Sequence, residues 1–192
     1  MSRPAVFIDR DGTINEQMGY INHPSRFTLL PRAAEAIKAL NQSGFASIVV
    51  SNQSGVARGY FPLDLVHEVH GLMGKLLSKE GARLDGVFFC PHHPQGIVPE
   101  YAISCDCRKP GTGLLEQARN ELDLDMGESY VIGDRCQDLE MARRAGLEGV
   151  LVLTGYGRGE REYILPRETV RPAYIAEDLL DAVRWIIDSK KQ

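Results

Sequence analysis

The stretch AVFIDRDGT, residues 5–13, joins four apolar residues to a pair of carboxylates and a glycine. A short, uninterrupted run of apolar and β-branched residues is typical of a strand that is buried on both faces, as in a parallel sheet. Further runs of this kind occur at residues 46–50, 86–90, 130–132 and 149–153. Residues 5–8 are therefore predicted to form the first of five strands, and the acidic pair follows directly where that strand ends.

Longer amphipathic segments separate these runs. They predict helices at residues 31–43, 63–79, 113–122, 136–145 and 179–187, and Gly44 and Gly146 each follow the end of one of them. Alternation of strands and helices predicts an α/β fold built on a doubly wound, mainly parallel sheet, in a single domain spanning residues 1–192. In such a sheet the ligand site lies beyond the carboxyl ends of the strands.

The composition limits the class of protein. The chain has 192 residues, of which 43% are hydrophobic and 25% charged, with a formal net charge of -4. An acidic chain of this kind is not expected to bind nucleic acid. It has no apolar run of roughly 18 residues that would span a membrane, and its N-terminus does not resemble a signal peptide. We therefore expect a cytoplasmic protein, and a monomer, because no strong exposed apolar patch is evident.

Four polar motifs follow or flank the predicted strands. They are DRDGT with Asp9 and Asp11, SNQS with Ser51 and Asn52, RKPG with Arg108 and Lys109, and GDRCQD with Asp134 and Asp138. Each has a plain structural explanation when taken alone: an Asx turn, loop chemistry, a solvated lysine, and acidic residues at a helix start. Together they would place carboxylates suited to Mg²⁺, a hydroxyl and a cation in one crevice.

The four motifs, in this order, resemble the signature of the haloacid dehalogenase-like phosphatases. The resemblance implies that Asp9 is the nucleophile and that Asp11 is the general acid and base. Ser51 and Lys109 would hold the transferring phosphoryl group, and Mg²⁺ would be bound by Asp9, the carbonyl of Asp11 and Asp134, with Asp138 in support. The chemistry agrees with this assignment, because a carboxylate can attack a phosphate dianion only when cations neutralise the site.

Three of the four cysteines gather in CPHHPQGIVPEYAISCDC, residues 90–107. Cys90, His92, Cys105 and Cys107 form two close pairs of soft ligands, which suit a closed, tetrahedral structural Zn²⁺ site; His93 is a competing nitrogen. A disulfide and free buried cysteines are the alternatives. A zinc-stapled loop insert would order this segment and deliver Arg108 and Lys109 to the crevice.

The zinc-loop motif and the segments FIDRDGTIN, SNQSGVARG and VIGDR narrow the resemblance to the D-glycero-D-manno-heptose 1,7-bisphosphate 7-phosphatases, over nearly the whole chain. The resemblance implies removal of the C7 phosphate from a small phosphorylated sugar, in the synthesis of nucleotide-activated heptose and lipopolysaccharide precursors. A histidinol-phosphate phosphatase is the close alternative, and a catalytically inactive zinc-stabilised binding module is the alternative of a different class.

Neither gap between the motifs has room for a separate cap domain, so loops should select the substrate. The candidate substrate-binding residues are Gln17, Met18, Gly19, Tyr20, Ser51, Asn52, Gln53, Ser54, Arg108, Lys109 and Arg135, and Arg58 lies in the same loops. Arg108 and Arg135 are the candidates for a second phosphate, because guanidinium groups bind phosphate oxygens well. His67 and His70, three residues apart in a predicted helix, are interpreted as surface or half-buried helix residues.

Overall fold

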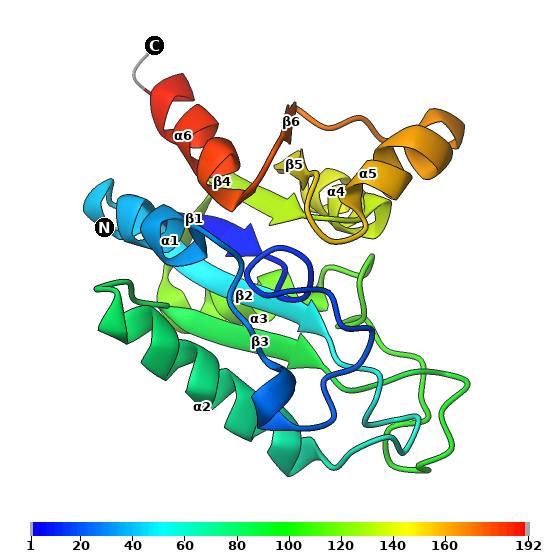
Figure 1. The fold of residues 1–192 in the computed structure, drawn as a ribbon. Coiled ribbons are helices and arrows are strands. Elements are labelled where there is room, and N and C mark those ends of the chain that lie inside the picture. Colours follow the sequence, from blue (N-terminus) through cyan, green and yellow to red (C-terminus); the bar gives the residue numbers. More distant parts are fainter. Residues whose placement is uncertain (1, 191–192) are drawn as a thin grey trace.

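The computed structural model describes residues 2–190 and contains one parallel sheet of six strands (Figure 1). The strand order is β3-β2-β1-β4-β5-β6, so β1 lies in the interior between β2 and β4. The strands are β1 (Arg3–Ile8), β2 (Ala46–Asn52), β3 (Gly86–Cys90), β4 (Leu124–Gly133), β5 (Glu148–Val152) and β6 (Tyr174–Ala176). This order confirms the predicted doubly wound α/β class.

Side chains of β1 alternate between two apolar layers, as the period of a strand requires. Val6 and Ile8 face a cluster that includes residues of α1 (Ala33–Gln42), α2 (Leu63–Lys79) and α6 (Leu179–Ser189). Ala5 and Phe7 face the opposite cluster, which includes residues of α3 (Gly113–Leu122) and α4 (Cys136–Ala145). Helices therefore cover both faces, and the central strands are apolar throughout because neither face meets water.

Helix ends follow the local sequence. The backbone N–H of Arg135 donates to the Asp138 carboxylate at the start of α4, and Gly146 ends that helix with a left-handed φ of 71°. Asp178 begins α6 by accepting a hydrogen bond from the N–H of Asp181 at 2.9 Å. No helix within residues 2–190 is both long and apolar enough to cross a membrane.

Two strand predictions were incomplete. β4 begins at Leu124 rather than at residue 130, although the segment LDMGES lacks a strand pattern. Its start is fixed by pairing with Arg3 and Pro4 across a register shift, and Ser129 Oγ accepts a hydrogen bond from the N–H of Ala5 at 2.8 Å. β6 was not predicted, because three residues are too few to show a period.

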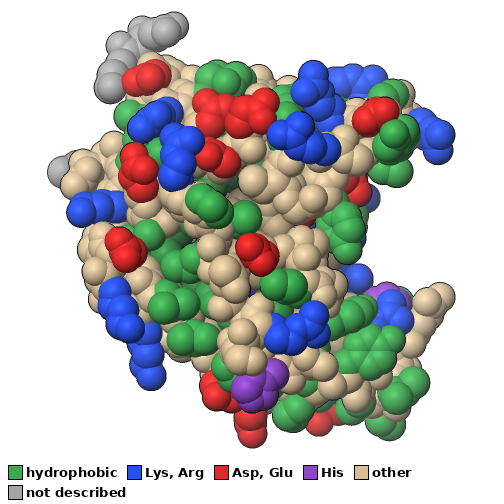
Figure 2. Space-filling view, viewed as in Figure 1, with side chains coloured by type: hydrophobic (Ala, Val, Ile, Leu, Met, Phe, Trp, Pro, Cys, Tyr) green, Lys and Arg blue, Asp and Glu red, His purple; other side chains and the backbone are tan. Residues whose placement is uncertain are grey.

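The loops that follow β1, β2, β3, β4 and β5 all leave from the same edge of the sheet, at the arrowheads in Figure 1. After β5 the chain forms the short helix α5 (Gly157–Gly159), a wide turn (Glu160–Ile164) and a 3₁₀ turn (Leu165–Arg167). Figure 2 shows the surface hollowed on this side, between the segment around α5 and the long loop that follows β3.

Candidate active site

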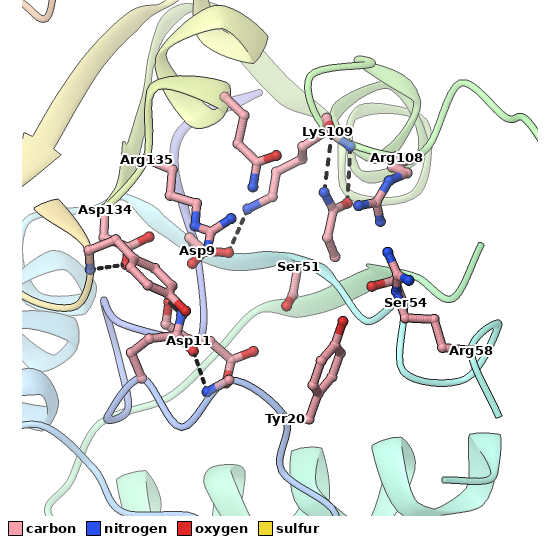
Figure 3. A pocket seen from close by; sticks show the side chains of 15 residues that line it. Asp9, Asp11, Tyr20, Ser51, Ser54, Arg58, Arg108, Lys109, Asp134 and Arg135 are labelled. Atoms are coloured by element: carbon pink, nitrogen blue, oxygen red, sulfur yellow. Dashed lines mark hydrogen bonds and ion pairs between the residues drawn. The ribbon is translucent and has the colours of Figure 1, made fainter. Parts of the chain in front are cut away.

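A cavity of about 300 Å³ lies at the carboxyl ends of the strands (Figure 3). It gathers residues from five separate loops of the chain. Its lining consists of Asp9, Asp11, Gln17, Gly19, Tyr20, Ser51, Asn52, Ser54, Arg58, Arg108, Lys109, Asp134, Arg135, Gln137 and Tyr156. The lining is polar and carries both signs of charge, which suits a small anionic ligand rather than an apolar one.

Lys109 and two carboxylates form a buried charged group at the back of the cavity. The Lys109 ammonium lies 2.5 Å from Asp9 Oδ1 and 2.6 Å from Asp138 Oδ1; the side chains of Lys109 and Asp138 are each 1% exposed and that of Asp9 is 11% exposed. Burial would lower the pKa of Lys109, but Asp138 and Asp9 raise it above its ordinary range. Lys109 is therefore a permanent cation beside Asp9.

Asp134 completes a cluster of three buried carboxylates, since oxygen atoms of Asp9, Asp134 and Asp138 lie within 4.8 Å of one another. Burial raises the pKa of Asp9 to about 6, an effect that Lys109 partly opposes. Burial and the charges of Asp9 and Asp138 raise the pKa of Asp134 to about 8. Such mutual repulsion is relieved by a hard cation with oxygen ligands, so the group fits Mg²⁺.

Glycine makes room for the Asp134 carboxylate. A Cβ atom at Gly12 would meet Asp134 Oδ2, and φ at Gly12 is 89°, a left-handed value that other residues rarely adopt. Tyr156 donates its backbone N–H to the same oxygen at 2.8 Å, and Thr154 Oγ1 donates to the carbonyl of Gly12 at 2.6 Å. The loop after β5 therefore fixes Asp134 against the loop after β1.

The Asp11 carboxylate accepts hydrogen bonds from three side chains. Arg10 Nη2 donates to both oxygens, at 2.9 and 2.8 Å, Asn15 Nδ2 donates at 3.0 Å and Gln53 Nε2 at 2.8 Å. Burial would raise the pKa of Asp11, but the charge and hydrogen bonds of Arg10, with those of Asn15 and Gln53, outweigh it and hold the pKa below its usual value. Asp11 is thus held in one orientation at the cavity wall.

The loop that carries Lys109 is attached to the end of β2. Asn52 Oδ1 accepts from the N–H of Lys109 at 3.0 Å, and Asn52 Nδ2 donates to the Lys109 carbonyl at 3.2 Å. Lys109 Nζ also donates to the carbonyl of Val50 at 3.1 Å, next to the buried Ser51. These contacts bring Ser51 and Lys109 to the same part of the cavity from distant parts of the chain.

Cys90, His92, Cys105 and Cys107 converge as the sequence predicted, with ligand atoms within 4.8 Å of one another. The Sγ atoms of Cys90 and Cys107 lie 3.0 Å apart, and His92 Nδ1 lies 3.3 Å from Cys107 Sγ. All four cysteines of the chain fall within the described residues, and no disulfide joins any two of them. Hydrogen bonding with Cys90 lowers the pKa of Cys107 to about 5. A compact set with a thiolate fits a tetrahedral metal ion.

His93 is turned away from this cluster. Its Nε2 lies 2.9 Å from Arg58 Nη2, and its backbone N–H donates to the Tyr101 carbonyl at 3.0 Å. Arg108 Nη1 donates to the His92 carbonyl at 3.3 Å. The loop after β3 therefore contacts Arg58 and carries Arg108; both arginines line the cavity, and Figure 3 shows them on the same side of it.

Arg135 lies on the other side of the cavity from Arg58 and Arg108 (Figure 3). Its guanidinium carbon stands 4.1 Å from the centre of the Tyr156 ring. Two predicted contact residues do not line the cavity: Met18 packs against the main apolar core, and Gln53 is buried behind Asp11 and Ser51. The sequence reasoning missed two lining residues: Tyr156, because the loop after β5 has no recognisable motif, and Gln137, which lies inside the GDRCQD motif between the residues that were singled out.

Known proteins resemble this chain over nearly its full length. A HAD-hydrolase-like family model matches residues 106–182. The D-glycero-D-manno-heptose-1,7-bisphosphate 7-phosphatase of Thermosynechococcus vestitus is 44% identical over 190 residues, which cover 97% of this chain and 96% of the relative. The D-glycero-beta-D-manno-heptose-1,7-bisphosphate 7-phosphatase of Escherichia coli K12 is 44% identical over 155 residues, covering 80% of this chain and 81% of the relative.

A solved structure agrees with these relatives. The D,D-heptose 1,7-bisphosphate phosphatase of B. bronchiseptica, crystallised with magnesium and phosphate, superposes with a TM-score of 0.85 and 29% identity. The superposition covers 97% of this chain and 99% of that one.

Proposed function

The chain belongs to the D-glycero-D-manno-heptose-1,7-bisphosphate 7-phosphatase family of HAD-like hydrolases, and from this membership we propose that it removes the C7 phosphate of D-glycero-D-manno-heptose 1,7-bisphosphate. The observation that carries the proposal is the 44% identity over 97% of the chain to a relative of that name. The buried pair of Asp9 and Lys109 supplies the nucleophile and the cation that this chemistry needs.

In the first step, a carboxylate oxygen of Asp9 attacks phosphorus and the bond between phosphorus and the C7 oxygen breaks. Asp11 acts as the acid in its protonated form, which the negative charge of the bound phosphate favours, and it gives this proton to the departing oxygen, so the sugar leaves as an alcohol. Lys109 and the Ser51 hydroxyl bind the phosphoryl oxygens as charge shifts onto them. The product of this step is a phosphorylated Asp9, which divides one slow hydrolysis into two faster reactions.

In the second step, Asp11 accepts a proton from water while the water oxygen attacks phosphorus. The bond from Asp9 to phosphorus breaks, and inorganic phosphate leaves. Asp9 and Asp134, with the carbonyl of Asp11, would hold Mg²⁺, and Asp138 supports them through Lys109 and the N–H of Arg135. Bound Mg²⁺ would neutralise charge on the phosphoryl oxygens and on the carboxylates around it.

The phosphate that is not cleaved would be bound by arginines. Arg108 borders the cavity and is braced by the His92 carbonyl, and Arg58 lies on the same side. Arg135 remains a candidate from the opposite side. A zinc ion held by Cys90, His92, Cys105 and Cys107 would fix the loop that places Arg108. We also propose that the enzyme is a cytoplasmic monomer that serves nucleotide-activated heptose and lipopolysaccharide precursor synthesis.

A phosphate-release panel tests this function. It compares both anomers of heptose 1,7-bisphosphate with fructose 1,6-bisphosphate and histidinol phosphate, in the presence of Mg²⁺. We expect one heptose bisphosphate anomer to have the highest kcat/KM, and Asp9→Asn to lose activity by more than about a hundredfold. A preference for histidinol phosphate would refute the sugar assignment, and an active Asp9→Asn variant would refute the mechanism.

A further inference from the structure

Arg10 lies between the two aspartates of DRDGT and has no role of its own in the proposed phosphoryl transfer. Its side chain is only 2% exposed and is the largest of the fully buried side chains in residues 2–190. Arginine is almost never fully buried unless it is paired. Its Nε atom is buried without a hydrogen-bond partner among the described residues, which costs free energy. The ion-pair partner of Arg10 is the Asp11 carboxylate, at 2.8 Å, so the contacts that Arg10 makes at the cavity wall explain its burial.

The guanidinium of Arg10 connects helix α2 to the Asp11 carboxylate. Nη2 donates to both oxygens of Asp11, while Nη1 lies 3.0 Å from Nε2 of His70. Because an arginine nitrogen can only donate, His70 Nε2 is the acceptor and its proton is on Nδ1. Burial, and next the charge of Arg10, lower the pKa of His70 to about 3, so the ring stays neutral. His70 thus anchors one end of the guanidinium and Asp11 takes the other.

Gln53 extends this network to the phosphoryl side of the cavity. Its Oε1 accepts from Arg10 Nη2 at 3.2 Å, and its Nε2 donates to Asp11 Oδ2 and Ser51 Oγ, each at 2.8 Å. One amide therefore ties Asp11 to Ser51, and Arg10 fixes that amide. The contacts come from the loop after β1, the loop after β2 and α2, three segments that are far apart in the sequence.

We propose that Arg10, anchored by His70, is a positioning residue for the Asp11 carboxylate. It orients Asp11 for proton transfer to the leaving oxygen and from water. Through Gln53 it also fixes the position of Asp11 relative to Ser51. The proposal rests on the function proposed above. Proton transfer needs the donor and acceptor atoms within hydrogen-bond reach, about 2.6–3.2 Å apart. A carboxylate that turns away by one ångström would slow both transfers, although the phosphoryl group would still bind.

Comparing the rates of variants on two substrates with different leaving groups distinguishes a positioning role of Arg10 from a structural one. A sugar alkoxide must be protonated as it departs, whereas nitrophenolate is a weak base and leaves without a proton. With p-nitrophenyl phosphate, loss of Asp11 orientation should spare the first step and slow only the attack of water.

The variants are Arg10→Met, Arg10→Lys, His70→Leu and His70→Gln. Gln can accept the Arg10 hydrogen bond through its amide oxygen and Leu cannot. His67→Leu is the control, because His67 also packs edge-on against Phe89 but does not contact Arg10.

We expect Arg10→Met to lower kcat on heptose bisphosphate about a hundredfold, with KM within about threefold of the parent. On p-nitrophenyl phosphate, rapid-mixing absorbance should show a burst of about one nitrophenol per chain, followed by slow turnover. His70→Leu should show the same pattern about tenfold more weakly, and His70→Gln and His67→Leu should resemble the parent. Arg10→Lys should retain part of the rate, since a charge remains at that place.

Two outcomes would overturn the proposal. One is an equal loss of the nitrophenol burst and of steady-state turnover in Arg10→Met and His70→Leu, which would indicate a general disturbance of the fold. The other is unchanged kcat in both variants. If Arg10→Met does not fold, the two His70 variants decide the question. The p-nitrophenyl phosphate experiment gives its answer even if the parent rejects heptose bisphosphate, so a wrong substrate assignment is recognised separately.

Discussion

Replacement of Lys109 by methionine should destabilise the protein in a way that depends on pH and on Mg²⁺. The ammonium contacts Asp9 at 2.5 Å and Asp138 at 2.6 Å, in a site where Lys109 and Asp138 are inaccessible to water and Asp9 is only slightly exposed. At an effective dielectric constant of about 20, each contact is worth roughly 6 kcal/mol before the cost of desolvation is subtracted. Methionine is an unbranched side chain one atom shorter than lysine, so it keeps most of the packing and removes the charge.

The expected cost of losing one partner from a buried ion pair is about 3–5 kcal/mol, because the remaining charges stay buried. For a chain of this length each kcal/mol lowers Tm by about 2–4 °C, so Tm at pH 8 should fall by roughly 6–20 °C. The Val50 carbonyl also loses its donor. Lys75→Met is the control: Lys75 is exposed in α2, and its replacement should change stability by less than about 0.5 kcal/mol.

The sign of the pH effect follows from the carboxyl groups. The pKa of Asp9 is about 6 and that of Asp134 about 8 with Lys109 present, and loss of the cation should raise the pKa of Asp9 further. The folded variant then binds protons that the unfolded chain, with ordinary aspartate pKa values, does not bind at pH 6. Its stability therefore rises as the pH falls from 8 to 6, and its deficit relative to the parent shrinks.

Mg²⁺ should also restore part of the stability of Lys109→Met at pH 8, since a divalent cation replaces the missing charge among the carboxylates. Activity should remain about 10²–10³-fold below that of the parent, because the phosphoryl oxygens lose a fixed cation. The measurement is thermal unfolding by circular dichroism after dialysis into Mg²⁺-free buffer; strong chelators are avoided so that the proposed zinc is not removed from the cysteine site. A Tm equal to that of Lys75→Met at pH 8, or a deficit that does not shrink at pH 6, would refute this account of the charges.

Three further predictions concern the second phosphate and the two metals. Arg108→Ala should lower kcat/KM for heptose bisphosphate about ten- to a hundredfold and that for a simple phosphomonoester much less; equal losses would place Arg108 in the common catalytic apparatus. Elemental analysis should find about one Zn per chain, lost in Cys107→Ser and kept in the control Cys136→Ser; zinc-free parent protein would refute the site. The Mg²⁺ concentration for half-maximal activity should fall from pH 6 to pH 8.5, because protons compete for Asp9 and Asp134 below their raised pKa values, and a constant requirement would contradict those values.

The pattern of apolar runs was sufficient to predict the α/β class and five of the six strands, because a strand covered on both faces needs uninterrupted apolar residues. The helix bounds for α2, α3 and α4 agree with the structure, and α1 and α6 differ by two residues at most at either end. The beginning of β4 could not be predicted. Leu124 and Asp125 belong to the sheet through pairing with Arg3 and Pro4, and such distant pairing leaves no periodic signal in the segment itself.

The convergence of the candidate site residues was predictable for a topological reason. Parallel strands end at the same edge of a sheet, so residues at strand ends meet however far apart they are in the chain. Asp9 and Lys109 are 100 positions apart and are ion-paired. The cysteine loop was predictable for a chemical reason, since two close pairs of soft ligands have few other uses.

No sequence pattern predicted the contacts that side chains make behind the cavity. Arg10 stands between two carboxylates in the sequence, a position where a solvent-exposed cation would be expected. His70 stands in an amphipathic helix, and the structure confirms its expected half-buried position. Their contact exists because the loop after β1 reaches α2 in the folded chain, and neither segment alone specifies the neighbour. The same holds for Gln53, whose amide reaches both Asp11 and Ser51 only after β1 and β2 are side by side. Sequence motifs thus predict the groups that are proposed to touch the substrate, because reaction chemistry restricts their residue types. The residues that position these groups are determined only by the packing of the folded chain. Arg10, a charged side chain that is only 2% exposed, is an example that only the structure reveals.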